Sequence, residues 1–179
     1  MSELKGQSER RATQVAILVY VALVAAALLV VVRRTPHPTT PLSNGVRARA
    51  SSYHAFGNHH PMFAIDGESS RHRLQKWVSA PGDTEPWIEV LFERPRDFSR
   101  VRIVHAGHAE KDEFTAQSYR LQCTNQGVGV DETAVGSNDR PIAEHNLDCR
   151  GVDTLRVEFD VEPGTPNDVA RVYEIEVLP

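Results

Sequence analysis

The chain has 179 residues and a formal net charge of −4 at pH 7, from 20 Lys and Arg against 24 Asp and Glu. A slightly acidic chain of this kind lacks the basic character of a nucleic-acid-binding protein, so we expect no nucleic-acid partner. The length fits one domain plus an additional segment.

The additional segment lies near the start of the chain. After a polar tail, residues 1–14, the stretch VAILVYVALVAAALLVVV (15–32) is apolar and uncharged. As an α-helix it would span roughly 27 Å, close to the hydrocarbon thickness of a bilayer. The run is longer than the apolar part of a typical signal peptide and ends in Arg33 and Arg34. It therefore predicts a single transmembrane helix, with a cleaved secretory signal as the alternative.

The flanks of this helix predict where the rest of the chain lies. Basic residues on both sides give opposing signals for its orientation. Because the N-terminal tail is short, we expect a single-pass protein of the cell membrane with its C-terminal part outside the cytoplasm. Residues 33–44 are rich in Pro and Thr, which is typical of an extended spacer. The folded domain is therefore expected at 45–179.

Within that domain, short segments with alternating apolar residues are separated by turn residues, and no amphipathic helix of useful length is present. The segments expected as strands are 86–92, 99–105, 118–123, 154–159 and 172–178, with further strands near 46–51 and 142–149. Short strands at this spacing predict an all-β fold, an antiparallel β-sandwich or jelly roll.

The two cysteines, Cys123 and Cys149, both fall on the apolar phase of their expected strands. In an oxidising compartment they could form a disulfide. The alternative is a pair of reduced core cysteines that act as small apolar side chains. The spacing matches neither a CxxC motif nor a zinc site.

The order of the segments resembles a known family. The stretches ARASSYHAFGNHHPMFAIDG, PWIEVLFERPRDFSRVRIVHAG, SYRLQC, TLRVEF and YEIEVL follow one another as in the discoidin domain, the coagulation factor 5/8 type C domain. The resemblance covers about residues 45–179. It implies an eight-stranded antiparallel jelly roll of the galactose-binding-like fold. Members of this family bind glycans, lipids or proteins through loops at one end and are generally not enzymes.

The resemblance also gives a role to the apolar run Met62–Ile65 and the Asp-Gly pair that follows it. In family members this run plugs the sandwich, and the turn often belongs to a structural calcium site. The matching ligands here would be Asp66 and Glu174, helped by backbone carbonyls, since calcium takes six to eight oxygen ligands. Asp-Gly also favours a simple turn. This chain departs from the family pattern because Trp77 lies 11 positions after Asp66.

A sugar site needs an aromatic ring for the apolar face of the sugar and several donors for its hydroxyl groups. The expected loops at one end of the sandwich carry such residues. The candidate ligand-binding residues are Tyr53, His54, Phe56, Asn58, His59, His60, Arg71, Arg73, His105 and His108.

The motifs of common enzymes are missing from the sequence. No HExxH, GxSxG, GxGxxG or P-loop occurs, and the His pairs lack the spacing of a zinc site. We therefore expect a membrane-anchored, non-catalytic module that binds a glycan. The alternative is a structural or assembly protein whose sandwich docks a protein partner at the membrane.

Overall fold

The computed structural model describes residues 45–57, 59–69 and 75–179. Within these ranges the chain forms seven β-strands and three 3-10 helices, and no helix is long and apolar enough to cross a membrane. The strands are β1 (Val46–Ala50), β2 (Trp77–Val78), β3 (Trp87–His105), β4 (Tyr119–Asn125), β5 (Val128–Val135), β6 (Ile142–Phe159) and β7 (Arg171–Leu178); the helices are η1 (Pro61–Ala64), η2 (Ala106–His108) and η3 (Asp112–Phe114). The predicted tail (1–14), membrane helix (15–32) and spacer (33–44) lie outside the described residues.

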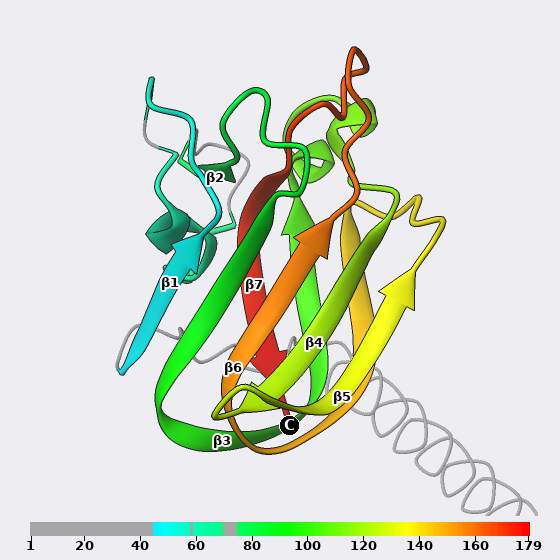
Figure 1. Ribbon diagram of the computed structural model, residues 1–179. Coiled ribbons are helices and arrows are strands. Elements are labelled where there is room, and N and C mark those ends of the chain that lie inside the picture. Colours follow the sequence, from blue (N-terminus) through cyan, green and yellow to red (C-terminus); the bar gives the residue numbers. More distant parts are fainter. Residues whose placement is uncertain (1–44, 58, 70–74) are drawn as a thin grey trace, which may run out of the picture. The chain divides into compact units, whose positions relative to one another are not determined.

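The strands form two antiparallel layers, because β3 and β6 are long and each runs from one layer into the other (Figure 1). In one layer the first half of β3 pairs with β1 and with the second half of β6, and β4 and β5 continue the sheet. In the other layer the second half of β3 lies between β7 and the first half of β6, with β2 beyond β7. The predicted antiparallel β-sandwich is confirmed.

The bend of β3 has a cause in its sequence. Pro95 cannot donate a backbone hydrogen bond to the ladder, and the β3–β6 register shifts between Leu91 and Arg100, as at β-bulges. The partner strand turns at Gly151, whose φ of 60° lies in the left-handed region that glycine adopts most easily. The N–H of Gly151 donates to Asp97 Oδ1 at 2.7 Å. Together these features fold both strands over at one end of the sandwich, hereafter the bend end.

Both ends of the described domain lie at this bend end. Val46, the first residue of β1, pairs with Phe92 just before the bend of β3. Leu178, the last residue of β7, pairs with Arg100 just after it. The loops that follow β1, follow β3 and precede β7 lie at the opposite end, hereafter the loop end (Figure 1).

The core between the layers follows the predicted alternation. Ile88 and Val90 of β3 and Leu155 and Val157 of β6 are fully buried, as is Trp77. Burial of large apolar side chains stabilises the fold by roughly 1.5–3 kcal/mol each. The same alternation places charged residues on the outer faces of the strands.

The apolar run that precedes Asp66 closes one side of this core. It forms the single turn η1, in which Pro61 occupies the first position and the ring of His60 accepts the N–H of Met62. Ala64 and Ile65 pack into the core cluster, whereas Met62 is exposed. Only the end of the run therefore acts as a plug.

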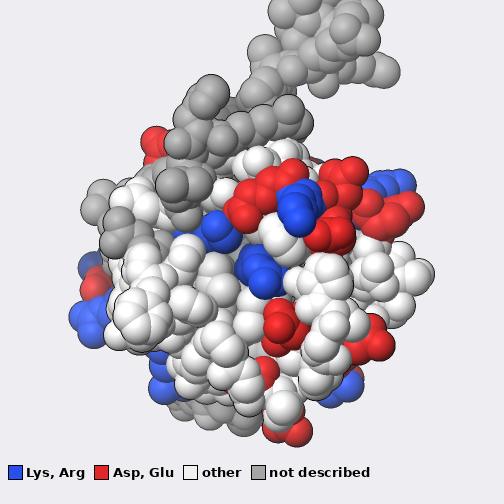
Figure 2. Space-filling view, turned by 90° about the horizontal axis from the view of Figure 1, so that it is seen from above, with Lys and Arg blue, Asp and Glu red and all other residues white. Residues whose placement is uncertain are grey.

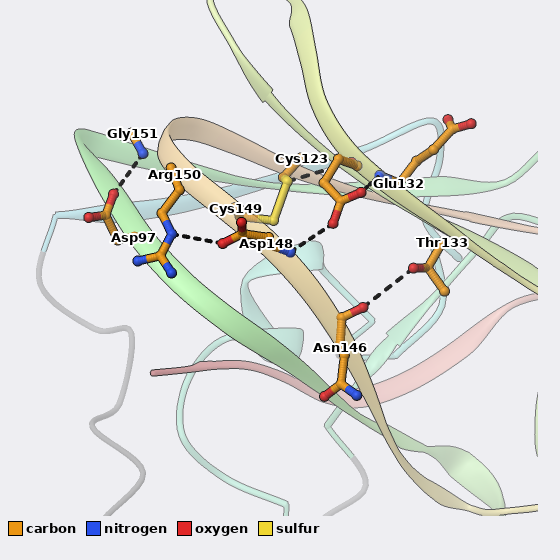
Figure 3. Close-up of a disulfide and its surroundings, with 10 residues drawn as sticks. Asp97, Cys123, Glu132, Thr133, Asn146, Asp148, Cys149, Arg150 and Gly151 are labelled. Atoms are coloured by element: carbon orange, nitrogen blue, oxygen red, sulfur yellow. Dashed lines mark hydrogen bonds and ion pairs between the residues drawn. A yellow bond between two sulfur atoms is a disulfide. The ribbon is translucent and has the colours of Figure 1, made fainter.

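A disulfide joins the two layers near the bend end (Figure 3). Cys123 lies on β4, and Cys149 lies in the first half of β6, with a Cα–Cα distance of 6.0 Å. Both cysteines are fully buried. Of the two alternatives for these cysteines, a disulfide or a pair of reduced core side chains, the structure has the disulfide.

Beside the disulfide, side chains of β5 bond to the first half of β6 in the other layer; this line of contact is hereafter the seam. Asp131 Oδ2 accepts the N–H of Asp148 at 2.7 Å, and Thr133 Oγ1 donates to the carbonyl of Asn146 at 3.4 Å (Figure 3). These bonds occupy backbone groups of β6 that would otherwise form an open sheet edge. The seam therefore holds the outermost strand of one layer against the other layer.

Candidate functional site

The loop end of the sandwich contains a cavity of about 380 Å³. Figure 2 looks onto this end and shows basic and acidic groups close together near its centre. The cavity is lined by His54, His59, Lys76, Val78, Pro81, Glu110, Phe114, Asp168, Val169 and Arg171.

An ion pair and a hydroxyl group meet in this cavity. Lys76 precedes β2, its side chain is 8 % exposed, and its Nζ lies 2.7 Å from Glu110 Oε1. The hydroxyl of Tyr173 donates to the same oxygen at 2.9 Å. The β3–β7 register shifts between Val104 and His105, where Tyr173 has no partner in the ladder; such bulges re-aim side chains. Burial, and then the nearby Glu110 carboxylate, raise the pKa of Tyr173, so its hydroxyl keeps its proton at neutral pH.

A second cation lies at the start of β7. The guanidinium of Arg171 stacks 4.5 Å from the centre of the Phe114 ring. One of its nitrogens donates to the carbonyls of Pro166 and Val169, at 2.6 and 3.2 Å, and another lies 3.6 Å from Asp168 Oδ1. Burial lowers the pKa of Arg171, yet an arginine remains charged at neutral pH. The loop before β7 is thus tied to the loop that carries Phe114.

Two histidines form another wall. The backbone N–H of His54 donates to Val78 at 2.8 Å, which holds the loop after β1 against β2. The ring of His54 meets the rings of His59 and Phe56 edge-on, at 5.7 and 6.1 Å. Burial lowers the pKa of His59, so this ring is neutral at pH 7. Phe56 itself is 83 % exposed beside these rings.

The arrangement can bind a small polar ligand. Two cations, two carboxylates and two imidazoles offer donors and acceptors within one cavity, and Val78 and Val169 add apolar walls. The described ranges contain no group of three or more His, Cys, Asp or Glu side chains that could hold a metal ion. The geometry therefore suits recognition of hydroxyl groups.

The predicted ligand residues other than His105 divide into three groups. His54 and His59 line the cavity. Phe56 lies beside it, Tyr53 and His60 pack on each other with ring centres 5.3 Å apart, and His108 belongs to η2; none of these four lines the cavity. Three candidates fall outside the described residues: Asn58, Arg71 and Arg73.

His105 is a wrong prediction as a ligand-binding residue. Its side chain is fully buried in the sandwich, so no ligand on the loops can reach it. The sequence contained the signal, because His105 shares the period-2 phase of Val101 and Ile103, which are buried core residues.

Sequence reasoning missed most of the residues that line the cavity. The lining residues that it did not single out are Val78, Pro81, Glu110, Phe114, Asp168, Val169 and Arg171. They come from three loops that are far apart in the chain, so no local spacing marks them as one site. Only the topology of the sandwich brings these loops together.

The proposed calcium ligands also lie close together, on a different part of the domain. Glu174 is 1 % exposed, and both of its carboxylate oxygens accept the N–H of Gly67 at 3.2 Å. Burial, with help from Asp66 and Glu176, raises the pKa of Glu174 to about 8. A buried carboxylate beside a second carboxylate fits a hard cation, which would offset this repulsion.

A substitution at Gly107 tests the packing of the loop that carries Glu110 and Phe114. A Cβ at this position would come within 2.0 Å of Thr115 Oγ1. Thr115 is buried, so we expect Gly107→Ala to lower the free energy of unfolding by about 1–3 kcal/mol and to distort the cavity. Gly136→Ala is the matched control, because a Cβ added there would meet no atom within 4 Å beyond its chain neighbours. Equal urea midpoints for the two variants would contradict this packing.

A jelly roll with a polar cavity among the loops at one end defines a class of ligand-binding domains. The chain belongs to the F5/8 type C domain family, whose model matches residues 47–175. The predicted family is therefore confirmed. Among curated proteins, none matches this chain.

Solved structures share the fold. A chitosan-binding module from a chitosanase/glucanase of Paenibacillus sp. IK-5 is 26 % identical, with a TM-score of 0.59 over 75 % of this chain and 96 % of that module. The Clostridium perfringens module CpGH89CBM32-5, solved with GalNAc-β-1,3-galactose, is 14 % identical, with a TM-score of 0.61 over 75 % and 96 %. The lectin domain of lectinolysin, solved with Lewis B antigen, is 16 % identical, with a TM-score of 0.62 over 78 % and 96 %.

Proposed function

We propose that the cavity at the loop end binds a glycan and that the domain is a non-catalytic recognition module. The observation that carries this proposal is the meeting of Lys76, Glu110 and Arg171 in one cavity beside aromatic rings. Charged side chains that already hold one another in place bind hydroxyl groups without further ordering. Among the similar solved structures, one is a chitosan-binding module and two were solved with GalNAc-β-1,3-galactose and Lewis B antigen, which supports the same class of ligand.

The experiment is a glycan array probed with the full chain in detergent, followed by titration of the strongest oligosaccharide. We expect selective binding that is lost in Arg171→Ala. Affinity of one such site is expected near the millimolar range, about −4 kcal/mol. Absence of binding to any glycan on the array, at an intact fold, would contradict the proposal.

A second function is favoured by one observation. Tyr53, Phe56 and Met62 are exposed apolar side chains, at 51, 83 and 41 %, on the segment between β1 and β2. Exposed apolar groups of this kind suit a protein interface. The assembly role would be favoured if the chain bound no glycan on the array and if a protein partner that binds the natural chain failed to bind Phe56→Ser.

We further propose that residues 15–32 anchor the protein in the cell membrane and place the domain outside the cytoplasm. The length and apolar character of this run support the anchor. Resistance to alkaline extraction tests it, and cleavage of the domain by external protease tests the orientation. Release of the full-length chain by alkaline extraction would contradict the anchor.

We also propose that Asp66 and Glu174 bind calcium as a structural ion. Without it, the raised pKa of Glu174 makes the folded protein hold an extra proton between about pH 4.5 and about pH 8. The associated stability is therefore present below about pH 4.5 and is lost as the pH rises to about 8. Calcium binds the ionised carboxylate, so it should oppose this loss.

The expected result is a calcium-dependent rise in melting temperature that is larger at pH 8 than at pH 5. Thermal unfolding followed by circular dichroism, in calcium or in EGTA, measures it. Glu174→Gln should remove both the calcium effect and this part of the pH dependence. An equal calcium effect in the variant would place the ion elsewhere.

A further inference from the structure

His105 is a buried polar side chain that the proposed binding site does not use. It ends β3, it is fully buried, and neither ring nitrogen has a hydrogen-bond partner among the described residues. Nearly all buried polar groups in proteins are paired, so an unpaired imidazole needs an explanation. Its backbone N–H is satisfied by the carbonyl of Pro141 at 2.8 Å.

The surroundings of His105 are aromatic and contain one further histidine. The ring of Tyr119 from β4 lies 5.2 Å away, and its hydroxyl lies 2.7 Å from Nε2 of His145 on β6. β7 meets His105 at the apolar residue Val172. His145 is the titratable side chain that acts on His105 here; burial lowers the pKa of His145 too, and a proton on it would repel a proton on His105.

A proton on His105 would therefore be a charge in the core without a partner. Burial, and to a lesser degree His145, lower the pKa of His105 to about 3. Outside the core an imidazole titrates near 6.5. Acid thus favours any conformation in which His105 reaches water.

The residue that follows His105 holds the candidate site together. The carbonyl of Ala106 accepts the N–H groups of Ala109 and Glu110, at 3.1 and 3.0 Å. Glu110 in turn pairs with Lys76 in the cavity. A displacement of His105 would therefore also move η2 and Glu110, which lines the cavity.

We infer that His105 is an acid-sensitive switch: when it takes up a proton, residues 106–115, which carry Glu110 and Phe114, detach from the sandwich. The consequence for the ligand, release of glycan on acidification, rests on the proposed function. The opening itself does not, since it needs no ligand.

Amide hydrogen exchange of the full chain in detergent, at pH 6.5, 5.5 and 4.5, measures this opening. After correction for the intrinsic pH dependence of exchange, we expect the opening constant of residues 106–115 to rise about fivefold from pH 6.5 to 5.5 and about ninefold from pH 5.5 to 4.5. His105→Phe, and His105→Leu as a second replacement, should remove this rise. His108→Gln is the matched control, since it removes a histidine of η2 itself and should retain the rise.

Three results would overturn the switch: opening that is independent of pH, opening that keeps its pH dependence in both His105 variants, or an equal loss of protection at Leu121 in β4. The last would mean global unfolding. Glycan binding by the same chain, measured in parallel, separates the binding function from the switch. Failure of all glycans to bind at pH 7 contradicts the binding function alone, whereas unchanged exchange with intact glycan binding contradicts the switch alone.

Discussion

Replacing Cys123 and Cys149 together by alanine is expected to lower the free energy of unfolding by roughly 3–4 kcal/mol. The bond closes a loop with a sequence separation of 26, and loops of this size gain about that much from the constraint on the unfolded chain. Because both cysteines are fully buried, the smaller side chains also leave a void. Urea unfolding of the full chain in detergent measures the loss.

Reductant provides the control for this prediction. Dithiothreitol should lower the urea midpoint of the natural chain toward that of the double variant and leave the variant unchanged. Asp131→Ala tests the neighbouring seam separately, because it removes the acceptor of the Asp148 N–H without touching sulfur. A double variant as stable as the natural chain would contradict a structural role of the disulfide.

Replacing Glu110 by alanine is expected to abolish measurable glycan binding and to lower the free energy of unfolding by about 2 kcal/mol. The change leaves Lys76, which is 8 % exposed, without its carboxylate and Tyr173 without its acceptor. Hydrogen bonds to charged groups contribute about 1.5–3 kcal/mol when one partner is removed. Titration with the strongest oligosaccharide of the array and urea unfolding measure the two effects.

A matched carboxylate lies on the same loop. Glu113 is 49 % exposed and pairs with Lys111, which is 72 % exposed. Exposed pairs contribute 0–1 kcal/mol, so Glu113→Ala should leave both stability and binding nearly unchanged. In the Glu110→Ala background, Lys76→Met removes the buried charge that has lost its partner. This second change should therefore recover stability but not binding. Equal stability of the Glu110 and Glu113 variants would contradict the role of the ion pair.

The strands that sequence reasoning found are those with one buried and one exposed face. Alternation predicted the strands of the core well, although Pro95 and the bulges concealed that 86–92 and 99–105 belong to one strand, β3. Segments 142–149 and 154–159 likewise join in β6 through Gly151. Alternation describes faces, and it does not report whether a chain continues through a bend.

Two strands were missed for physical reasons. β5 ends its layer, and Val128 and Val130 are exposed rather than buried, so its apolar pattern is weak. Its contacts across the seam use the polar side chains of Asp131 and Thr133. β2 has two residues and is too short for any periodic signal.

The residues of the candidate site could be predicted from the sequence less completely than the fold. His54 and His59 were found because they lie within one aromatic loop. Lys76, Glu110 and Arg171 meet only after the sandwich has folded, and single charged residues in separate loops carry no pattern. His105 shows the opposite error, since its place on a histidine-rich loop outweighed its phase in the strand.

The position of both domain ends at the bend end has a consequence for how the protein is displayed. Any tether that precedes Gly45 joins the sandwich at the pole farthest from the cavity (Figure 1). Neither end of the described domain therefore interrupts the loops that line the cavity, and those loops are held by the strands of the sandwich alone.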